Sequence, residues 1–165
     1  MLTIGNFFQL GYVTTDLEAA VEVYASRFGV SEFLTIDTAS MNPNLPFTSL
    51  IGLAWAGDVQ IELIQPKDVA TPLYADAMPK SGFGINFHHI GCMIDSEQGW
   101  AAAEAEVARQ GLTVASRSGV PGKIDVAYVD TRALCGHYLE LVWARGDGLA
   151  FLQGAPRNPV RRPAA

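Results

Sequence analysis

Apolar positions follow a helical period in two stretches that occupy corresponding places in the two halves of the chain. Residues 17–28 carry apolar side chains three and four positions apart, which is the pattern of a helix that buries one face. Residues 97–110 repeat the pattern, with Trp100, Ala103 and Val107 as the apolar stripe. We therefore predict two amphipathic helices, each of which packs one face against the rest of the chain.

Residues with capping preferences mark the predicted ends of both helices. Thr15 and Glu18 have the spacing of a capping box, and Gly29 follows the last apolar position of the first helix. Ser96 is the expected N-cap of the second helix, and Gly111 follows that helix. Both helices are thus expected to end at a glycine.

Strand-like segments surround each predicted helix, one before it and three after it. Those after the first helix are EFLTID, TSLIGLAWA and VQIELIQ, and those after the second are LTVASRS, IDVAYVDT and HYLELVW. The order strand, helix, strand, strand, strand therefore occurs twice. We predict a single domain over residues 1–146, with modules 6–66 and 85–145, a Pro- and Gly-rich linker over 67–84 and a C-terminal extension over 147–165.

Four polar residues of metal-ligating type lie inside apolar strands at positions that correspond between the modules. Gln9 and His89 are each followed by an aliphatic residue and a glycine. Glu62 and Glu140 occupy corresponding places in the closing strands VQIELI and HYLELV. If each module curls into half a barrel, the four side chains converge in a common cavity, where the nearby glycines leave space.

Alternation along the strands decides which face each side chain occupies. Gln60 and Glu62 share the face opposite the aliphatic residues of VQIELI, and Glu140 points away from the leucines beside it. Within FHHIG, alternation sends His88 and His89 to opposite faces. We therefore predict that His89 belongs to the site and that His88 packs or forms hydrogen bonds on the other face.

Two carboxylates that meet in a cavity repel each other and lose hydration unless a cation compensates them. Two carboxylate oxygens, one imidazole nitrogen and one amide oxygen suit a divalent ion. Four protein ligands on a six-coordinate ion leave two neighbouring positions for oxygens of water or substrate. Such a site polarises a carbonyl group and stabilises an enolate, which is Lewis-acid catalysis.

Composition and charge remove several classes of function. A chain of 165 residues favours one domain, and its formal net charge of −6 gives little support to nucleic-acid binding. No apolar run reaches the length of a membrane span, and no export signal is evident. Cys92 and Cys135 form no CxxC pattern and suggest a reducing compartment. We expect a cytoplasmic protein with neither nucleic-acid nor membrane partners.

Four stretches of the chain together carry a resemblance to a known family. They are FQLGYVTTDLEAAVEVYASRFG, VQIELIQP, GFGINFHHIGCMID and VAYVDTRALCGHYLELVW, within about residues 6–146. They resemble the vicinal oxygen chelate superfamily, which includes glyoxalase I, methylmalonyl-CoA epimerases, extradiol dioxygenases and bleomycin-resistance proteins. The resemblance implies an α+β fold in which two βαβββ modules form a curved mixed-sheet half-barrel pair around a central cavity. Members are often dimers, and we expect a homodimer.

Carried over by position, the resemblance places the metal ligands at Gln9, Glu62, His89 and Glu140. The implied cofactor is one divalent ion of zinc, nickel, cobalt, manganese or iron. Epimerases usually have His and Gln at the first two positions, whereas this set resembles that of eukaryotic-type glyoxalase I. The implied reaction is proton transfer next to a metal-bound carbonyl, by a glyoxalase-like lyase, isomerase or epimerase. Glu140 is then the general base, with Glu62 as a second base for an epimerisation.

Two alternatives stay open, an extradiol-type ring-cleaving dioxygenase and a non-catalytic, resistance-type module that binds a small molecule. The first normally needs two histidines and one carboxylate on iron. The second lacks metal ligands. The expected substrate is a small-molecule carbonyl compound, with a thioester as one option. A coenzyme A or glutathione thioester would need basic residues near the cavity mouth, and those available are Lys67, Lys80, Arg117, Lys123 and Arg132.

Overall fold

The computed structural model describes residues 6–42, 44–45, 47–68 and 71–159. Its strands are β1 (Phe7–Thr14), β2 (Leu34–Asp37), β3 (Ser49–Ala56), β4 (Val59–Pro66), β5 (Ile85–Ile94), β6 (Val114–Val120), β7 (Ile124–Val129), β8 (Tyr138–Ala144) and β9 (Arg157–Asn158). Its helices are α1 (Leu17–Val23), α2 (Thr38–Met41), α3 (Pro72–Ala75), α4 (Glu97–Arg109), α5 (Arg132–Cys135) and α6 (Asp147–Gln153), and a π-helical turn over Tyr24–Phe28 continues α1.

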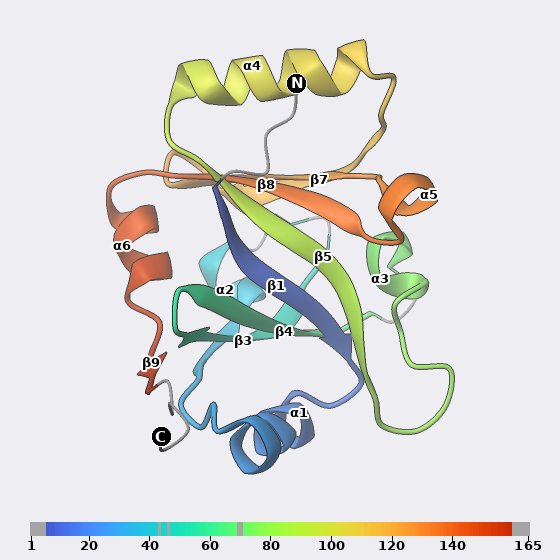
Figure 1. Ribbon diagram of the computed structural model, residues 1–165, viewed down its shortest axis with the longest axis vertical. Coiled ribbons are helices and arrows are strands. Elements are labelled where there is room, and N and C mark those ends of the chain that lie inside the picture. The colour runs from blue at the N-terminus through green and yellow to red at the C-terminus, as the bar shows by residue number, and fades with distance from the viewer. Residues whose placement is uncertain (1–5, 43, 46, 69–70, 160–165) are drawn as a thin grey trace, which may run out of the picture.

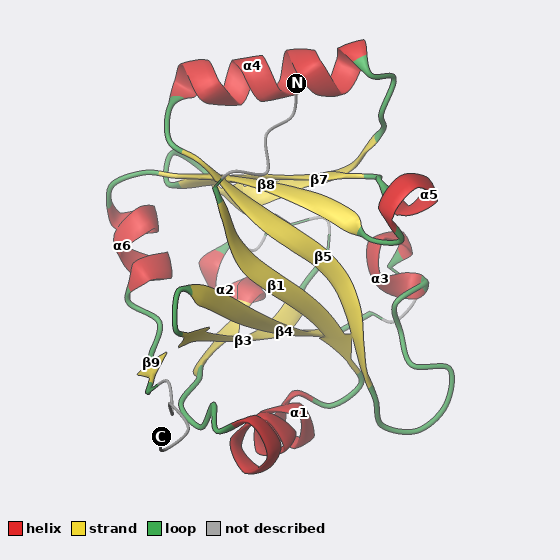
Figure 2. Ribbon diagram, in the orientation of Figure 1, coloured by secondary structure: helices red, strands yellow, loops and turns green. Residues whose placement is uncertain are grey.

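One mixed sheet joins the strands in the order β2-β3-β4-β1-β5-β8-β7-β6, and β9 pairs with β3. The first strands of the two modules, β1 and β5, pair antiparallel at the centre, and each lies parallel to the last strand of its own module, β4 or β8. The central strands run side by side, and the sheet bends strongly around them (Figures 1 and 2). The predicted α+β class with a curved mixed sheet is therefore confirmed, and both modules contribute to one sheet within a single chain.

The two amphipathic helices cover opposite outer sides of this sheet, α4 at the top of Figure 1 and α1 at the bottom. Leu17 of α1 packs in one buried cluster with Ile61 and Leu63 of β4. Val107 of α4 packs in another with Leu139 of β8. Because these aliphatic residues face the helices, the polar residues that alternate with them face inward, as predicted. Among the described residues, no helix is both long and apolar enough to cross a membrane.

The start of α1 corrects one predicted cap, and the other ends agree with the sequence. Asp16 is the N-cap in place of Thr15, because the Asp16 carboxylate accepts the N–H of Ala19 at 3.0 Å. Gly29 follows the π-helical turn with a φ of 72°, a left-handed conformation that glycine adopts without strain. Ser96 caps α4 through its side chain, as predicted.

A β-bulge in β5 corrects the predicted placement of the two adjacent histidines. Gly11 of β1 pairs with His89 and the next residue, Tyr12, pairs with Phe87, so the ladder skips His88. The extra residue of a bulge interrupts the alternation of faces. The rings of His88 and His89 consequently lie 5.1 Å apart between centroids. Both side chains lie on the inner face, whereas strict alternation predicted opposite faces.

The segment after the second module packs back onto the first. Trp55 Nε1 and Gln60 Nε2 both donate hydrogen bonds to the carbonyl oxygen of Leu152 in α6, at 3.3 Å and 3.0 Å. Asn158 of β9 is buried and accepts two backbone N–H groups that precede β2. These contacts hold α6 and β9 against the strands of the first module. The domain boundary predicted at residue 146 stays a prediction.

Candidate metal centre

Polar side chains and glycines form two adjacent rows across the inner face of the sheet. The rows are Glu62–Gly11–His89 and Gln9–Gly91–Glu140. An ideal Cβ atom on Gly11 would overlap the ring of His89, and one on Gly91 would lie 2.7 Å from Gln9 Oε1. The glycines therefore leave the space that these side chains occupy.

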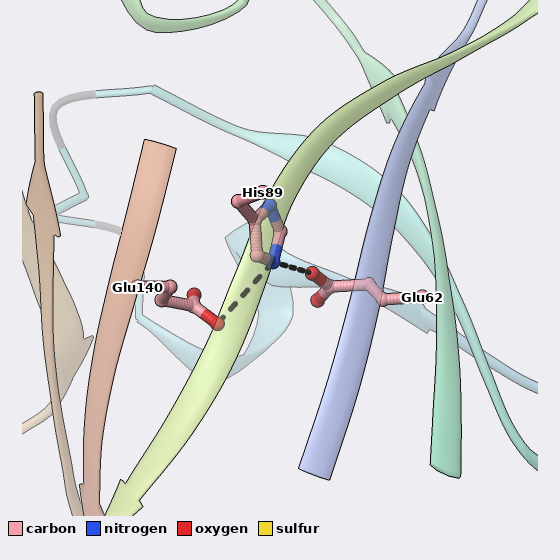
Figure 3. Close-up of side chains that lie close together, drawn as sticks. All are labelled: Glu62, His89 and Glu140. Atoms are coloured by element: carbon pink, nitrogen blue, oxygen red, sulfur yellow. Dashed lines mark ion pairs between the residues drawn. The ribbon is translucent and has the colours of Figure 1, made fainter. Parts of the chain in front are cut away.

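His89 lies between two carboxylates that come from opposite sides (Figure 3). Its Nε2 atom is 3.2 Å from Glu62 Oε2 and 3.3 Å from Glu140 Oε2. Gln9 Oε1 lies 3.4 Å from the same nitrogen. Donor atoms of Glu62, His89 and Glu140 all lie within 4.8 Å of one another, and all three residues are buried. The structure thus brings together the four residues that the sequence singled out.

The chemistry of this donor set fits a divalent cation. Glu62 Oε2 is buried and forms no well-aligned hydrogen bond among the described residues, although His89 Nε2 lies 3.2 Å away, and such a carboxylate oxygen is costly to bury. One imidazole cannot balance the charge of two ionised carboxylates, whereas a divalent cation can. Gln9, Glu62, His89 and Glu140 would hold such an ion through one nitrogen and three side-chain oxygens, a mixed set of hard and borderline donors.

Without a cation, the cluster retains protons. Burial acts to lower the pKa of His89, but Glu140 and Glu62 outweigh burial and raise this pKa to about 10. Burial also raises the pKa of Glu62, and the charge of Glu140 adds to this rise, whereas the neighbouring His89 opposes it. A metal ion has to displace the proton on His89 Nε2, because that nitrogen can bind a cation only when it is neutral.

His88 orients the imidazole ring of His89 through a contact with Nδ1, the ring nitrogen that is not near the carboxylates. Its Nδ1 lies 2.9 Å from Nδ1 of His89, and its Nε2 lies 2.9 Å from the carbonyl oxygen of Leu73. Because a carbonyl only accepts, Nε2 of His88 carries the proton, and its Nδ1 accepts the N–H of His89 Nδ1. Burial, followed by the charge of His89, lowers the pKa of His88 to about 3, so His88 stays neutral. This arrangement presents His89 Nε2 to the carboxylates.

Gln60 gives corresponding support to Gln9. The side-chain amide of Gln9 donates to Gln60 Oε1 at 2.9 Å, and Gln60 Nε2 in turn donates to the Leu152 carbonyl at 3.0 Å. Because the nitrogen of the Gln9 amide is engaged, its oxygen faces the cluster. Sequence alternation placed Gln60 on the face of Glu62 but assigned it no function. The available signal was a second buried polar residue two positions before a candidate ligand.

A cavity of about 140 Å³ opens onto the cluster. Gln9, Glu62 and Glu140 line its polar end, together with Tyr74 and Tyr128. Burial, and then the nearby carboxylates, raises the pKa of both tyrosines well above 10, so both hydroxyls remain protonated. The cavity is therefore lined by hydrogen-bond donors and carboxylates at one end. The remaining wall is mostly apolar, with Phe8, Ile36, Ile51, Leu53, Val126 and Val142 among its residues.

The five basic residues considered for thioester binding lie outside the described lining of this cavity. Four of them form ion pairs with acidic side chains: Lys67 with Asp37, Arg117 with Glu104, Lys123 with Asp147, and Arg132 with Asp130 and Asp76. The interior thus presents carboxylates without a lysine or arginine among the residues described.

Comparison with known proteins agrees with this geometry. A family model described as the Glyoxalase/Bleomycin resistance protein/Dioxygenase superfamily matches residues 8–128. The chain therefore belongs to this superfamily. A search of curated proteins gave no significant match.

Several solved structures share the fold at low sequence identity. Methylmalonyl-CoA epimerase from Mycobacterium tuberculosis is 17% identical with a TM-score of 0.60, over 91% of this chain and 97% of that one. A variant of the Streptomyces coelicolor methylmalonyl-CoA epimerase in complex with 2-nitronate-propionyl-CoA is 18% identical with a TM-score of 0.61, over 87% and 97%. A hypothetical protein from Bacillus halodurans is 18% identical with a TM-score of 0.62, over 85% and 94%. These similarities establish the common fold.

Proposed function

We propose that the protein is a divalent-metal-dependent lyase, isomerase or epimerase of the glyoxalase type that moves a proton next to a carbonyl group. The observation that carries this proposal is the convergence of Glu62, His89 and Glu140 within 4.8 Å at the polar end of a cavity. When bound there, with Gln9 as the fourth ligand, a divalent ion supplies Lewis acidity that polarises a carbonyl and stabilises negative charge on its oxygen.

Glu140 is the proposed general base. Its carboxylate lines the cavity, where a carbon next to the substrate carbonyl comes within reach. Burial and the charge of Glu140 raise the pKa of Tyr128, so its hydroxyl stays protonated at the edge of the cavity and can donate to Glu140 or to a substrate oxygen. Glu62 lies on the other side of His89 (Figure 3), where it could return a proton to the opposite face of the carbon in an epimerisation.

The histidines argue against ring cleavage of the extradiol type, which uses two histidines and one carboxylate. The chain has three histidines. Both ring nitrogens of His88 are engaged, by His89 and by the Leu73 carbonyl. His137 directs Nδ1 to the carbonyl of Tyr138. Among the described residues, His89 is therefore the one histidine that the structure groups with the carboxylates of Glu62 and Glu140.

The proposed partner is a small-molecule carbonyl compound, handled in the cytoplasm. The two cysteines are free thiols, Cys92 buried and Cys135 exposed, which supports a reducing compartment. A homodimer stays a prediction from the family resemblance. Size-exclusion chromatography with light scattering would test it, with one mass for the monomer and twice that mass for the dimer.

Exchange of a carbon-bound proton with solvent tests the proposed function directly. Metal-loaded protein is incubated in deuterium oxide with α-hydroxy ketones and α-substituted thioesters, and loss of the proton signal is followed by NMR. We expect metal-dependent exchange that is lost in Glu140→Gln while the metal is retained. Glu104→Gln is the matched control and should exchange normally, because Glu104 is a half-buried residue of α4 that pairs with Arg117 and lies outside the described cavity lining. Metal and compound binding without any exchange would contradict the proposal and favour a binding module.

A further inference from the structure

We infer that the substrate carries an uncharged apolar group of about the size of a benzene ring next to two neighbouring oxygen atoms. This inference rests on the proposed function, because the cluster has to engage those oxygens. The cavity that opens onto the cluster has a volume of about 140 Å³. An enclosed apolar cavity of roughly 150 Å³ is known to hold one benzene molecule. The space therefore has room for one compact apolar group of this size.

The walls of the cavity are suited to such a group. Ile36 and Ile51 line it from the first module, and Val126 and Val142 line it from the second. Phe151 of α6 lines it as well, so the segment after residue 146 helps to shape the space. An alkyl or aryl group in contact with these side chains would leave water and gain the hydrophobic contribution to binding.

A charged group would find no partner in this space. Among the described lining residues there is no lysine or arginine, whereas Glu62 and Glu140 are both present. A carboxylate or phosphate that enters the apolar part of the cavity would lose hydration without a lysine or arginine to pair with. The cavity therefore selects against an anionic substituent that enters it.

The neighbouring surface does not supply the missing charge. An adjoining depression shares Val120, Ile124 and Phe151 with the cavity and contains Lys123. Lys123 already pairs with Asp147, with 3.2 Å between Nζ and Oδ2. The positive and negative charges there compensate each other, so this edge of the cavity gives little attraction to the phosphates of a nucleotide-bearing thioester.

Three hydroxamates serve as probes, because each presents two neighbouring oxygens to a metal site. Acetohydroxamate carries a methyl group, benzohydroxamate a phenyl ring, and 4-carboxybenzohydroxamate the same ring with a negative charge. Their affinities for the zinc-, nickel- or cobalt-loaded protein are measured by titration calorimetry. We expect benzohydroxamate to bind at least about tenfold more tightly than acetohydroxamate. We expect the carboxylated ring to bind at least about tenfold more weakly than the plain ring.

A matched pair of arginine substitutions on β6 tests the charge argument. Ser118 lines the cavity, whereas Ala115 on the same strand is exposed and lies outside the described lining. Ser118→Arg should raise the affinity of the carboxylated probe by about tenfold or more, because it adds a cation to the wall. Ala115→Arg adds the same charge outside the cavity and should leave the three affinities unchanged. Circular dichroism establishes that both variants fold.

The outcomes separate this inference from the proposed function. Equal or tighter binding of the carboxylated ring by the wild type would overturn the inference and leave the metal chemistry intact, and this comparison needs no variant. Failure of all three probes to bind a protein that holds its metal would overturn the proposed function, and the inference with it. The predicted ranking, shifted by Ser118→Arg alone, would support both.

Discussion

Replacing Gly11 with alanine should damage the metal centre without changing a ligand. Gly11 of β1 pairs with Glu62 on one side and with His89 on the other, and its ideal Cβ would overlap the His89 imidazole. β1 is bonded to strands on both sides, so we expect the ring to move and the strand to stay. Movement of the ring would also break the 2.9 Å contact with His88 that orients it.

The expected loss of metal affinity follows from the displacement of the His89 ring and from the loss of its contact with His88. Disturbing a group that orients a metal ligand typically costs about 10- to 100-fold in affinity, which corresponds to about 1.4–2.8 kcal/mol. Here the ligand itself is displaced, so we expect the upper end, a loss of about 100-fold or more. Overfilling a packed interior costs about 1–3 kcal/mol in the free energy of unfolding.

Competition with a chromophoric chelator measures metal affinity, and denaturant unfolding of the metal-free protein measures stability. Gly52→Ala on β3 is the matched control, because its Cβ would lie 3.2 Å from Leu17 Cδ1 and 3.3 Å from Phe33 Cδ1, away from the cluster. We expect this control to lose some stability and to keep its metal affinity. Wild-type metal affinity in Gly11→Ala would refute His89 as a ligand.

Three further predictions concern the groups around the cluster. His88→Phe should weaken metal binding by about 10- to 100-fold and shift the absorption bands of the cobalt-loaded protein, whereas His88→Gln, which keeps a donor and an acceptor, should recover part of the affinity. Gln60→Leu should weaken metal binding by about tenfold, since the Gln9 amide would lose its orienting partner; unchanged affinity would show that Gln9 is not held by Gln60. Metal affinity should rise about tenfold per pH unit between pH 7 and 9, because the pKa of His89 is raised to about 10 and the ion must displace that proton. Calorimetry in buffers of different ionisation enthalpy would count the released protons, and a pH-independent affinity would contradict the assignment.

The four candidate ligands could be found in the sequence because two physical regularities act together. Alternation along a strand sets the face of a side chain, and a repeated module places equivalent residues in equivalent positions. Glu62 and Glu140 satisfy both, and both face the cavity. The helix stripes were predictable from the helical spacing of apolar residues, and Leu17 and Val107 are buried against the sheet.

The positions of His88 and Gln60 could not be fully predicted because they depend on contacts between distant parts of the chain. The ring of His88 lies beside that of His89 because the β1–β5 ladder skips a residue. The register of two paired strands cannot be derived from the sequence of either strand alone. The function of Gln60 depends on its contact with the carbonyl of Leu152, a residue far along the chain. The cap at Asp16 was a local choice between neighbouring residues that both favour this position.

The metal content of the purified protein shows whether the cluster of Gln9, Glu62, His89 and Glu140 holds an ion. The wild type and the double variant His89→Ala with Glu140→Ala are prepared without chelator and analysed by elemental mass spectrometry. We expect about one divalent ion per chain in the wild type and loss of that ion in the variant. A wild type that holds no ion, and that none of zinc, nickel, cobalt, manganese and iron(II) stabilises against heat, would contradict this expectation.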